Sequence, residues 1–227
     1  MAKKKIKLDE KGRDPNSVLI ICAHSDDQIF GPGGTVAKYA KDGKKVYTVI
    51  FSYGEMSHPL HQKQYTVKTR VKEAIDVDKF LGGQGVTFLG LDEAKFTEQF
   101  KSRKMYPKLK RLILQYNPAI IFTHSTDDPQ PDHRALNKIL LETLDRMRYK
   151  CDVYMFDIWN IFNFKGRDYV KIIVDISDTF KLKLKALKMF ESQKVSLFSL
   201  TWSVYVKAWL SGKRIGVKYA EVFYKIR

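Results

Sequence analysis

The stretch SVLIICAHSDDQIFGPGG, Ser17–Gly34, decides the fold. Its first part, Val18–Cys22, is short, apolar and uninterrupted, which is typical of a strand buried on both faces of a parallel sheet. His24, Asp26 and Asp27 follow where that strand would end, and a run of glycines comes next. In open α/β sheets ligands bind at this edge, and glycines let the backbone approach a ligand closely. The sequence therefore predicts chemistry at the carboxyl edge of a parallel sheet.

A second polar stretch, HSTDDPQPDHR at residues 124–134, follows another short β-prone run, Ala119–Thr123. A histidine with a carboxylate three positions on, as in the first stretch, can bind one divalent ion if the turn bends back. A catalytic zinc site uses three protein ligands and keeps one position open, so one further ligand is needed. Asp132 and His133 end the second stretch and offer that ligand. We therefore expect two strand ends to meet at a metal site.

Hydrophobic periodicity predicts an α/β fold with a mostly parallel sheet. The expected helices are Thr35–Lys41, Tyr65–Leu81, Glu98–Tyr116, Pro131–Tyr149 and Thr179–Gln193, and the further strands are Lys45–Ser52, Val86–Leu91, Cys151–Ile158 and Tyr169–Ile176. A length of 227 residues suits one domain with a sizeable core. Residues 1–16 are basic and polar and are expected to form a loose solvated arm, which leaves residues 17–227 as a single domain.

The two polar stretches resemble the motifs of a known family, the LmbE-like or PIG-L-type zinc N-deacetylases. Ala23–Gln28 is similar to the family's Ala-His-Pro-Asp-Asp-Glu motif, and Gln130–His133 is similar to its His-Pro-Asp-His motif. Further segments resemble the family in order along the chain, namely Gly31–Thr35, Thr69–Ala74, Ala186–Gln193 and Gly216–Phe223. The resemblance implies a Rossmann-like three-layer α/β sandwich. It also implies removal of an acetyl group from an N-acetylated amino sugar of the N-acetylglucosamine type, or from a related small amide.

The resemblance further implies a role for each matching residue. His24, Asp27 and His133 would hold Zn²⁺, which lowers the pKa of a bound water toward about 7 and polarises the acetamide carbonyl. Asp26 would take the proton of that water as general base. Spacing alone does not say which of the two neighbouring acids binds the metal. Arg70 would contact the substrate, because its fork of donors suits sugar hydroxyls or a phosphate.

Three positions depart from the family pattern. Ser25 stands where the family has proline and Gln28 where it has glutamate, and both are expected only to shape the turn. The third departure is the more serious. Gln130 stands where the family has a histidine thought to steady the oxyanion or to protonate the leaving amine, and glutamine donates a hydrogen bond but no proton. Asp132 would then only orient His133 or cap a helix. We hypothesise that His124 at the strand end supplies the missing acid, with His58 as the second choice.

The loop Tyr53–Gln64 carries His58 and His61. We interpret both as solvated loop residues rather than metal ligands, because a lone pair of histidines lacks the ligand count of a site. Gly31–Gly34 lacks the G-x-G-x-x-G spacing of a dinucleotide-binding turn, and no acid ends the second expected strand at Ser52. Dinucleotide binding is therefore the weaker interpretation of this turn.

Lysine and arginine outnumber aspartate and glutamate by 41 to 25, which gives a formal net charge of +16. Such an excess attracts nucleic acid, an anionic membrane surface or an acidic substrate. The alternative to an enzyme is thus a basic binding protein with a vestigial metal site. Nucleic acid is not favoured, because the cations of Glu98–Tyr116 are spread over several faces without interleaved aromatic residues. A metal-dependent hydrolase of another bond, such as a phosphoester, would use the same ligands.

Location and assembly leave weaker traces. The N-terminus has no apolar segment of a signal peptide, no apolar run of about 18 residues is present, and the two cysteines form no disulfide framework. These observations favour the cytoplasm and exclude a membrane span. Val195–Leu210, VSLFSLTWSVYVKAWL, would put several aromatic residues on one helix face. We interpret that face as core or as the subunit interface of a homo-oligomer, with a wall for an acyl or lipid part of a substrate as the alternative.

Overall fold

The computed structural model describes residues 7–55, 63–158 and 169–227. A seven-stranded sheet runs through it in the order β3-β2-β1-β4-β5-β7-β6. The parallel strands are β1 (Asp14–Cys22), β2 (Lys45–Ile50), β3 (Val86–Phe88), β4 (Pro118–His124) and β5 (Asp152–Phe156), and β7 (Ala220–Lys225) runs antiparallel to both β5 and β6 (Lys171–Asp175). The mostly parallel sheet predicted from the sequence is confirmed.

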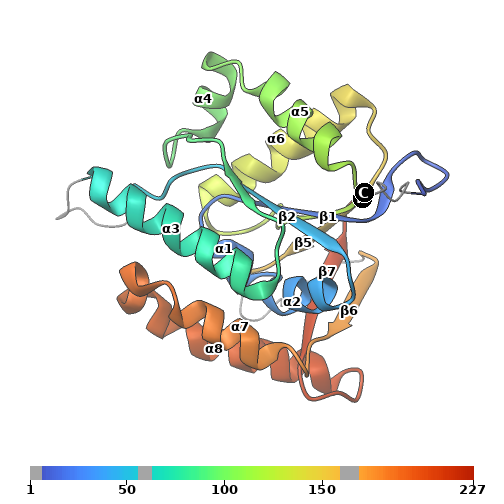
Figure 1. Ribbon diagram of the computed structural model, residues 1–227, viewed down its shortest axis with the longest axis vertical. Helices are drawn as coiled ribbons and strands as arrows, with labels where there is room; N and C mark the ends of the chain where they lie inside the picture. The colour runs from blue at the N-terminus through green and yellow to red at the C-terminus, as the bar shows by residue number, and fades with distance from the viewer. Residues whose placement is uncertain (1–6, 56–62, 159–168) are drawn as a thin grey trace, which may run out of the picture.

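Helices cover both faces of this sheet (Figure 1). One layer consists of α1 (Asp27–Phe30), α2 (Gly33–Lys41), α3 (Lys63–Leu81), α7 (Phe180–Lys188), a 3-10 turn at Glu191–Gln193 and α8 (Lys194–Lys213). The other layer consists of α4 (Phe96–Ser102), α5 (Tyr106–Tyr116) and α6 (Pro131–Met147). The predicted three-layer α/β sandwich is therefore confirmed.

Strand β1 forms the centre of the molecule because both of its faces are covered. Ile20 and Cys22 pack into one core with residues of α1, α2, α7 and α8, whereas Leu19 and Ile21 pack into a second core with residues of α4, α5 and α6. These four side chains are at most 1% exposed. Burying side chains of this size contributes about 1.5–3 kcal/mol each, so the end of β1 is a rigid support for the polar residues that follow it.

The predicted helix Glu98–Tyr116 is wrong, because the chain forms two helices there. Lys104 lies between α4 and α5 with φ +51°. A residue with left-handed backbone angles cannot continue a right-handed helix, so α4 ends before it. Helix α5 then begins with a proline in its first turn. The predicted helix Thr179–Gln193 is also shorter, since α7 ends at Lys188 and the 3-10 turn follows.

The boundary of the N-terminal arm also differs from the prediction for residues 1–16. Strand β1 begins at Asp14, and both Arg13 and Asp14 are buried. Arg13 donates to the main-chain oxygen of Ala119 at 3.3 Å and forms an ion pair with Asp9. The last residues of the expected arm therefore belong to the sheet, while the single-domain organisation stays a prediction.

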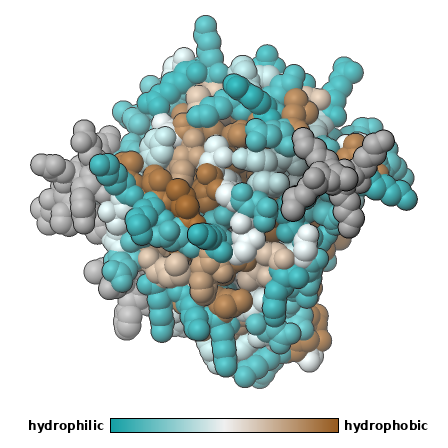
Figure 2. Space-filling model, viewed as in Figure 1, coloured by the Kyte–Doolittle hydropathy of each residue, from teal (hydrophilic) through white to brown (hydrophobic). Residues whose placement is uncertain are grey.

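Helix α8 turns most of its aromatic row outward. Trp202, Tyr205 and Trp209 are 54%, 47% and 40% exposed, whereas Val204 and Ala208 on the same helix are buried. The core interpretation of this row is thus wrong for the side chains described, and a subunit interface stays a prediction. Figure 2 shows a largely hydrophilic face with small apolar groups between the polar side chains. Within the part of the chain that the structure describes, no helix has both the length and the apolarity to cross a bilayer.

Candidate metal centre

The two predicted polar stretches meet at one place on the sheet. His24, Asp26 and Asp27 follow β1, His124 is the last residue of β4, and His133 lies in the first turn of α6. Strand β1 has β4 as its parallel neighbour on one side and β2 on the other. The chain passes from β1 to β2, so the strand order reverses between β1 and β4. The carboxyl ends of such a pair form the crevice where open α/β sheets bind ligands.

His24, Asp27 and His133 form a compact buried group. One possible ligand atom from each residue lies within 4.8 Å of the others. Asp27 Oδ2 is 3.3 Å from His24 Nδ1 and 3.5 Å from His133 Nε2. His133 Nε2 is buried and has no hydrogen-bond partner among the residues described. An orphaned imidazole nitrogen beside a carboxylate and a second imidazole fits a metal ion, and this nitrogen and oxygen donor set suits zinc.

A carboxylate stands behind each of these two histidines. Asp132 Oδ2 is 3.6 Å from His24 Nε2, and its carboxylate also accepts the Ala94 N–H at 2.9 and 3.0 Å. Asp128 Oδ1 is 3.0 Å from His133 Nδ1. The expectation that Asp132 orients His133 is therefore wrong. Adjacent residues of a helix point about 100° apart, so Asp132 faces the other imidazole.

Sequence reasoning missed Asp128. Its side chain is fully buried, and Oδ1 also accepts the main-chain N–H of Gln130 at 2.9 Å. This local turn directs the carboxylate inward, whereas the neighbouring Asp127 is exposed. A turn-forming acid three residues before the helix was the available signal, although the spacing alone does not distinguish Asp127 from Asp128.

His124 packs beside the metal group but is enclosed. Its ring stacks on that of His133 with 3.7 Å between centroids, and its Nε2 accepts the Ala23 N–H at 3.0 Å. Burial and the charge of His133 lower the pKa of His124 to about 4. A neutral, fully buried imidazole does not suit the proton donor expected here. His124, Asp128 and His133 do form a second group with possible ligand atoms within 4.8 Å of one another.

The charges of the centre favour a cation. Although burial opposes it, hydrogen bonds to Asp132 and Asp27 raise the pKa of His24 to about 10. Burial is likewise outweighed at His133, where the charge of Asp27 and the contact with Asp128 raise the pKa to about 9. Against the effect of burial, the imidazoles of His133 and His124 hold the pKa of Asp27 well below its ordinary value. Protons and a metal ion therefore compete for these nitrogens.

Asp26 stands next to this group, beside an arginine. Arg70 of α3 is 3% exposed, and its Nη2 lies 3.5 Å from Asp26 Oδ1 and 3.1 Å from Ser25 Oγ. Burial and the charge of Asp27 raise the pKa of Asp26, while Arg70 opposes this. Gln130 precedes α6 and is partly buried. His58 and His61 lie outside the residues described.

The last strand anchors the turn that follows the first motif. Glu221 of β7 accepts the N–H groups of Gly34 and Thr35 at 2.9 and 2.8 Å, and the Thr35 hydroxyl at 2.6 Å. Lys183 of α7 pairs with Glu221 at 2.6 Å and donates to two main-chain oxygens at the end of α1. A buried ion pair whose polar atoms are all satisfied holds such a turn in one geometry. The sequence singles out Glu221 only as one residue of Gly216–Phe223, a segment that resembles the family.

The family model described as PIG-L, GlcNAc-PI de-N-acetylase, matches residues 19–144, which is more than half of the chain. The diacetylchitobiose deacetylase of Thermococcus kodakarensis is 26% identical, over 97% of this chain and 87% of that protein.

Solved structures show the same fold. The N,N'-diacetylchitobiose deacetylase of Pyrococcus horikoshii has a TM-score of 0.76 at 24% identity, over 97% of this chain and 87% of that one. The 4-carboxy-2-hydroxymuconate hydratase of Pseudomonas putida KT2440 has a TM-score of 0.79 at 19% identity, over 93% and 96% of the two chains.

Proposed function

Because the chain belongs to the PIG-L family, described as GlcNAc-PI de-N-acetylases, we propose that it is a zinc-dependent N-deacetylase. Its substrate would be an N-acetylated amino sugar of the N-acetylglucosamine type or a related small amide. The observation that carries this proposal is the buried group of His24, Asp27 and His133 with a further carboxylate, Asp26, directly beside it.

We assign the metal to His24, Asp27 and His133 rather than to the second group of possible ligands. His133 belongs to both groups. Its Nδ1 lies 3.0 Å from Asp128 Oδ1 and its Nε2 lies 3.5 Å from Asp27 Oδ2. We therefore take Asp128 as the carboxylate that orients the ring and Asp27 as the ligand that shares the metal with Nε2. Zinc bound by two imidazoles and one carboxylate acts as a Lewis acid on a carbonyl and acidifies water. His124 then supports the centre by accepting the Ala23 N–H and stacking on His133.

Asp26 is the general base of the proposed reaction. It takes a proton from the attacking water as the oxygen bonds to the acetamide carbon, and it returns that proton to the nitrogen as the C–N bond breaks. The products are acetate and a free amine. Arg70 holds Asp26 by charge at 3.5 Å and fixes the preceding Ser25. Gln130, at the start of α6, is left to donate a hydrogen bond to the oxyanion.

Arg70 as a substrate contact stays part of the proposal, in a modified form. The Arg70 guanidinium already contacts Ser25 Oγ, Asp26 Oδ1 and the main-chain oxygen of Gly54. A substrate would therefore meet an arginine that is already positioned, which lowers the entropy cost of binding. The net charge of +16 would suit a substrate with an acidic group. We also infer a cytoplasmic enzyme, because both cysteines are free and buried.

The fold alone does not determine the reaction, because a hydratase shares it. Addition of water to an unsaturated acid would use the same metal and the same base, so this is the second candidate. A nucleic-acid-binding protein would not need the proposed metal ligands to be buried together with the carboxylates of Asp128 and Asp132. The deacetylase is favoured because the family model and the relative from Thermococcus kodakarensis are described by that activity.

The test is acetate release by protein stripped of metal and reloaded with zinc. The panel contains N-acetylglucosamine, N,N'-diacetylchitobiose and N-acetylglucosamine joined to an acidic aglycone. Asp26→Asn should lower kcat by about 10²- to 10⁴-fold, the range of general acid–base catalysis, while the protein still binds zinc. Asp127→Asn is the matched control, because that carboxylate is exposed, and it should leave kcat unchanged.

Two outcomes would contradict the proposal. If Asp26→Asn kept the rate of the unchanged protein, Asp26 would not be the base. If zinc bound tightly and no panel member released acetate, the deacetylase itself would be the wrong reaction, and hydration of an unsaturated acid would be tested next.

A further inference from the structure

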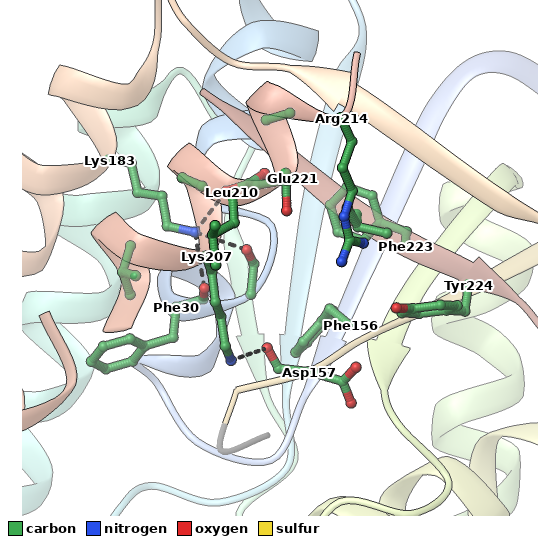
Figure 3. A pocket seen from close by; sticks show the side chains of 16 residues that line it. Phe30, Phe156, Asp157, Lys183, Lys207, Leu210, Arg214, Glu221, Phe223 and Tyr224 are labelled. Atoms are coloured by element: carbon green, nitrogen blue, oxygen red, sulfur yellow. Dashed lines mark hydrogen bonds and ion pairs between the residues drawn. The ribbon is translucent and has the colours of Figure 1, made fainter. Parts of the chain in front are cut away.

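A cavity of about 310 Å³ lies between α8, β7 and the end of β5 (Figure 3). None of the three proposed metal ligands lines it. Phe156 lines it, and the same ring packs against His124 with 4.9 Å between centroids. The cavity is thus separate from the metal centre and adjoins it through one aromatic side chain.

The inner wall of the cavity is apolar. Phe30, Phe156 and Phe223 contribute aromatic rings, and Val204 and Ala208 of α8 close the side. All five side chains are buried. Its volume lies at the lower end of the range of small-molecule pockets, about 300–1,000 Å³, which are lined mainly by such residues.

Two cations, Lys207 of α8 and Arg214 directly after the end of that helix, face this apolar wall. Lys207 Nζ donates to the main-chain oxygens of Ile158 at 2.6 Å and Asp157 at 3.3 Å. Burial lowers the pKa of Lys207 to about 8, which leaves it mostly charged at neutral pH. The guanidinium of Arg214 extends toward the cavity in Figure 3, and it has no hydrogen bond or ion pair with any residue described. The charge of Asp157 partly offsets the effect of burial on Lys207, but no carboxylate among the residues described forms an ion pair with either cation.

The remaining charges of the cavity leave an excess of one positive charge. Lys183 and Glu221 line it as well, but they pair with each other at 2.6 Å. Asp157 contributes one negative charge. Lys207 and Arg214 therefore outweigh Asp157, and the cavity favours a ligand with a single negative charge.

We propose that this cavity binds a small amphipathic carboxylate. The apolar body of the ligand would lie on Phe30, Phe156 and Phe223, and its carboxylate would accept hydrogen bonds from Arg214 and from the free proton of the Lys207 ammonium. Arginine suits this role because its planar fork matches both oxygens of a carboxylate. The site is distinct from the proposed deacetylase site, and its occupancy does not depend on that activity.

The test is calorimetric titration of the zinc-loaded protein with octanoate, octanol and acetate. Carboxylates also bind zinc, so the octanoate titration is repeated with protein stripped of zinc. Octanoate should bind at least tenfold more tightly than either octanol or acetate. Arg214→Gln, an exposed position that need not disturb folding, should weaken octanoate at least fivefold. Ala208→Phe, which fills the cavity, should weaken it further.

Lys218→Gln is the matched control, because it removes one exposed positive charge outside the cavity. It should leave octanoate binding unchanged. Equal affinity for octanol and octanoate would overturn the proposal, and so would equal effects of Arg214→Gln and Lys218→Gln. Binding that disappears when zinc is removed belongs to the metal centre and would overturn it too. Because these are binding measurements, their failure leaves the deacetylase proposal untouched.

Discussion

Each imidazole of the proposed metal centre has a carboxylate of its own on the nitrogen that faces away from the other ligands. Asp132 serves His24, and Asp128 serves His133. Such a carboxylate fixes the tautomer and the ring orientation and makes the imidazole a stronger ligand. The two pairs differ in environment, since Asp128 is fully buried whereas Asp132 is 7% exposed and also accepts the Ala94 N–H. We therefore expect His133 to depend more on its carboxylate than His24 does.

Replacing that buried carboxylate tests this dependence. Asp128→Asn should weaken zinc binding by about 10- to 100-fold, because a neutral amide makes His133 a poorer ligand. Competition with a chromophoric chelator at fixed pH measures the affinity. Asp127→Asn, at the exposed neighbouring position, should bind zinc as the unchanged protein does. Equal affinities for the two variants would show that Asp128 does not tune the centre.

Between elements, one carboxylate joins α3 to the strands beside it. Asp78 accepts the Gly85 N–H at 3.0 Å and lies 3.4 Å from the Thr48 hydroxyl of β2. Burial raises its pKa from 3.8 to about 6. A carboxyl whose pKa is raised by folding contributes its full stability below about pH 3.8 and loses it as the pH rises through about 6. The connection between α3 and β3 is thus weaker at neutral pH than in mild acid.

Asp78→Asn should therefore stabilise the protein at pH 7.5, by about 1–2 kcal/mol. This gain is smaller than the free energy that corresponds to the whole pKa shift, because the amide must find new hydrogen-bond partners. At pH 4 the gain should vanish or reverse. Denaturant unfolding at several pH values measures the difference. Asp76→Asn on the same helix, beside the exposed Lys72, should show no such dependence. If Asp78→Asn raised the free energy of unfolding equally at every pH, the gain would not come from the ionisation of the Asp78 carboxyl group.

Elements whose pattern is dominated by burial could be predicted from the sequence, and those set by local turns could not. Val18–Cys22 predicted a doubly covered strand because each face meets its own layer. The meeting of Asp27 and His133 followed from parallel strand ends. The break at Lys104 depends on one backbone angle, and the inward side chain of Asp128 depends on one turn. Neither leaves a periodic trace in the sequence.

At the scale of the whole molecule, the charge excess of +16 acts on stability as well as on binding. Like charges repel one another in the compact state. Several exposed cations form no ion pair with any other residue that the structure describes, among them Lys68, Lys110 and Arg111. Salt shortens the range of their repulsion from about 10 Å at 0.1 M toward about 3 Å at 1 M. Folding should therefore become more favourable as salt is added.

The melting temperature of the zinc-loaded protein should rise between ~0.02 M and ~0.5 M NaCl, by about 2–4 °C for each kcal/mol of repulsion removed. A triple variant, Lys68→Gln, Lys110→Gln and Arg111→Gln, should melt higher at low salt and respond less to added salt. The charge-conserving variant, Lys68→Arg, Lys110→Arg and Arg111→Lys, should behave like the unchanged protein. If salt lowered the melting temperature, or if both variants responded alike, ion pairs would outweigh repulsion, and the basic excess would have to be explained by binding alone.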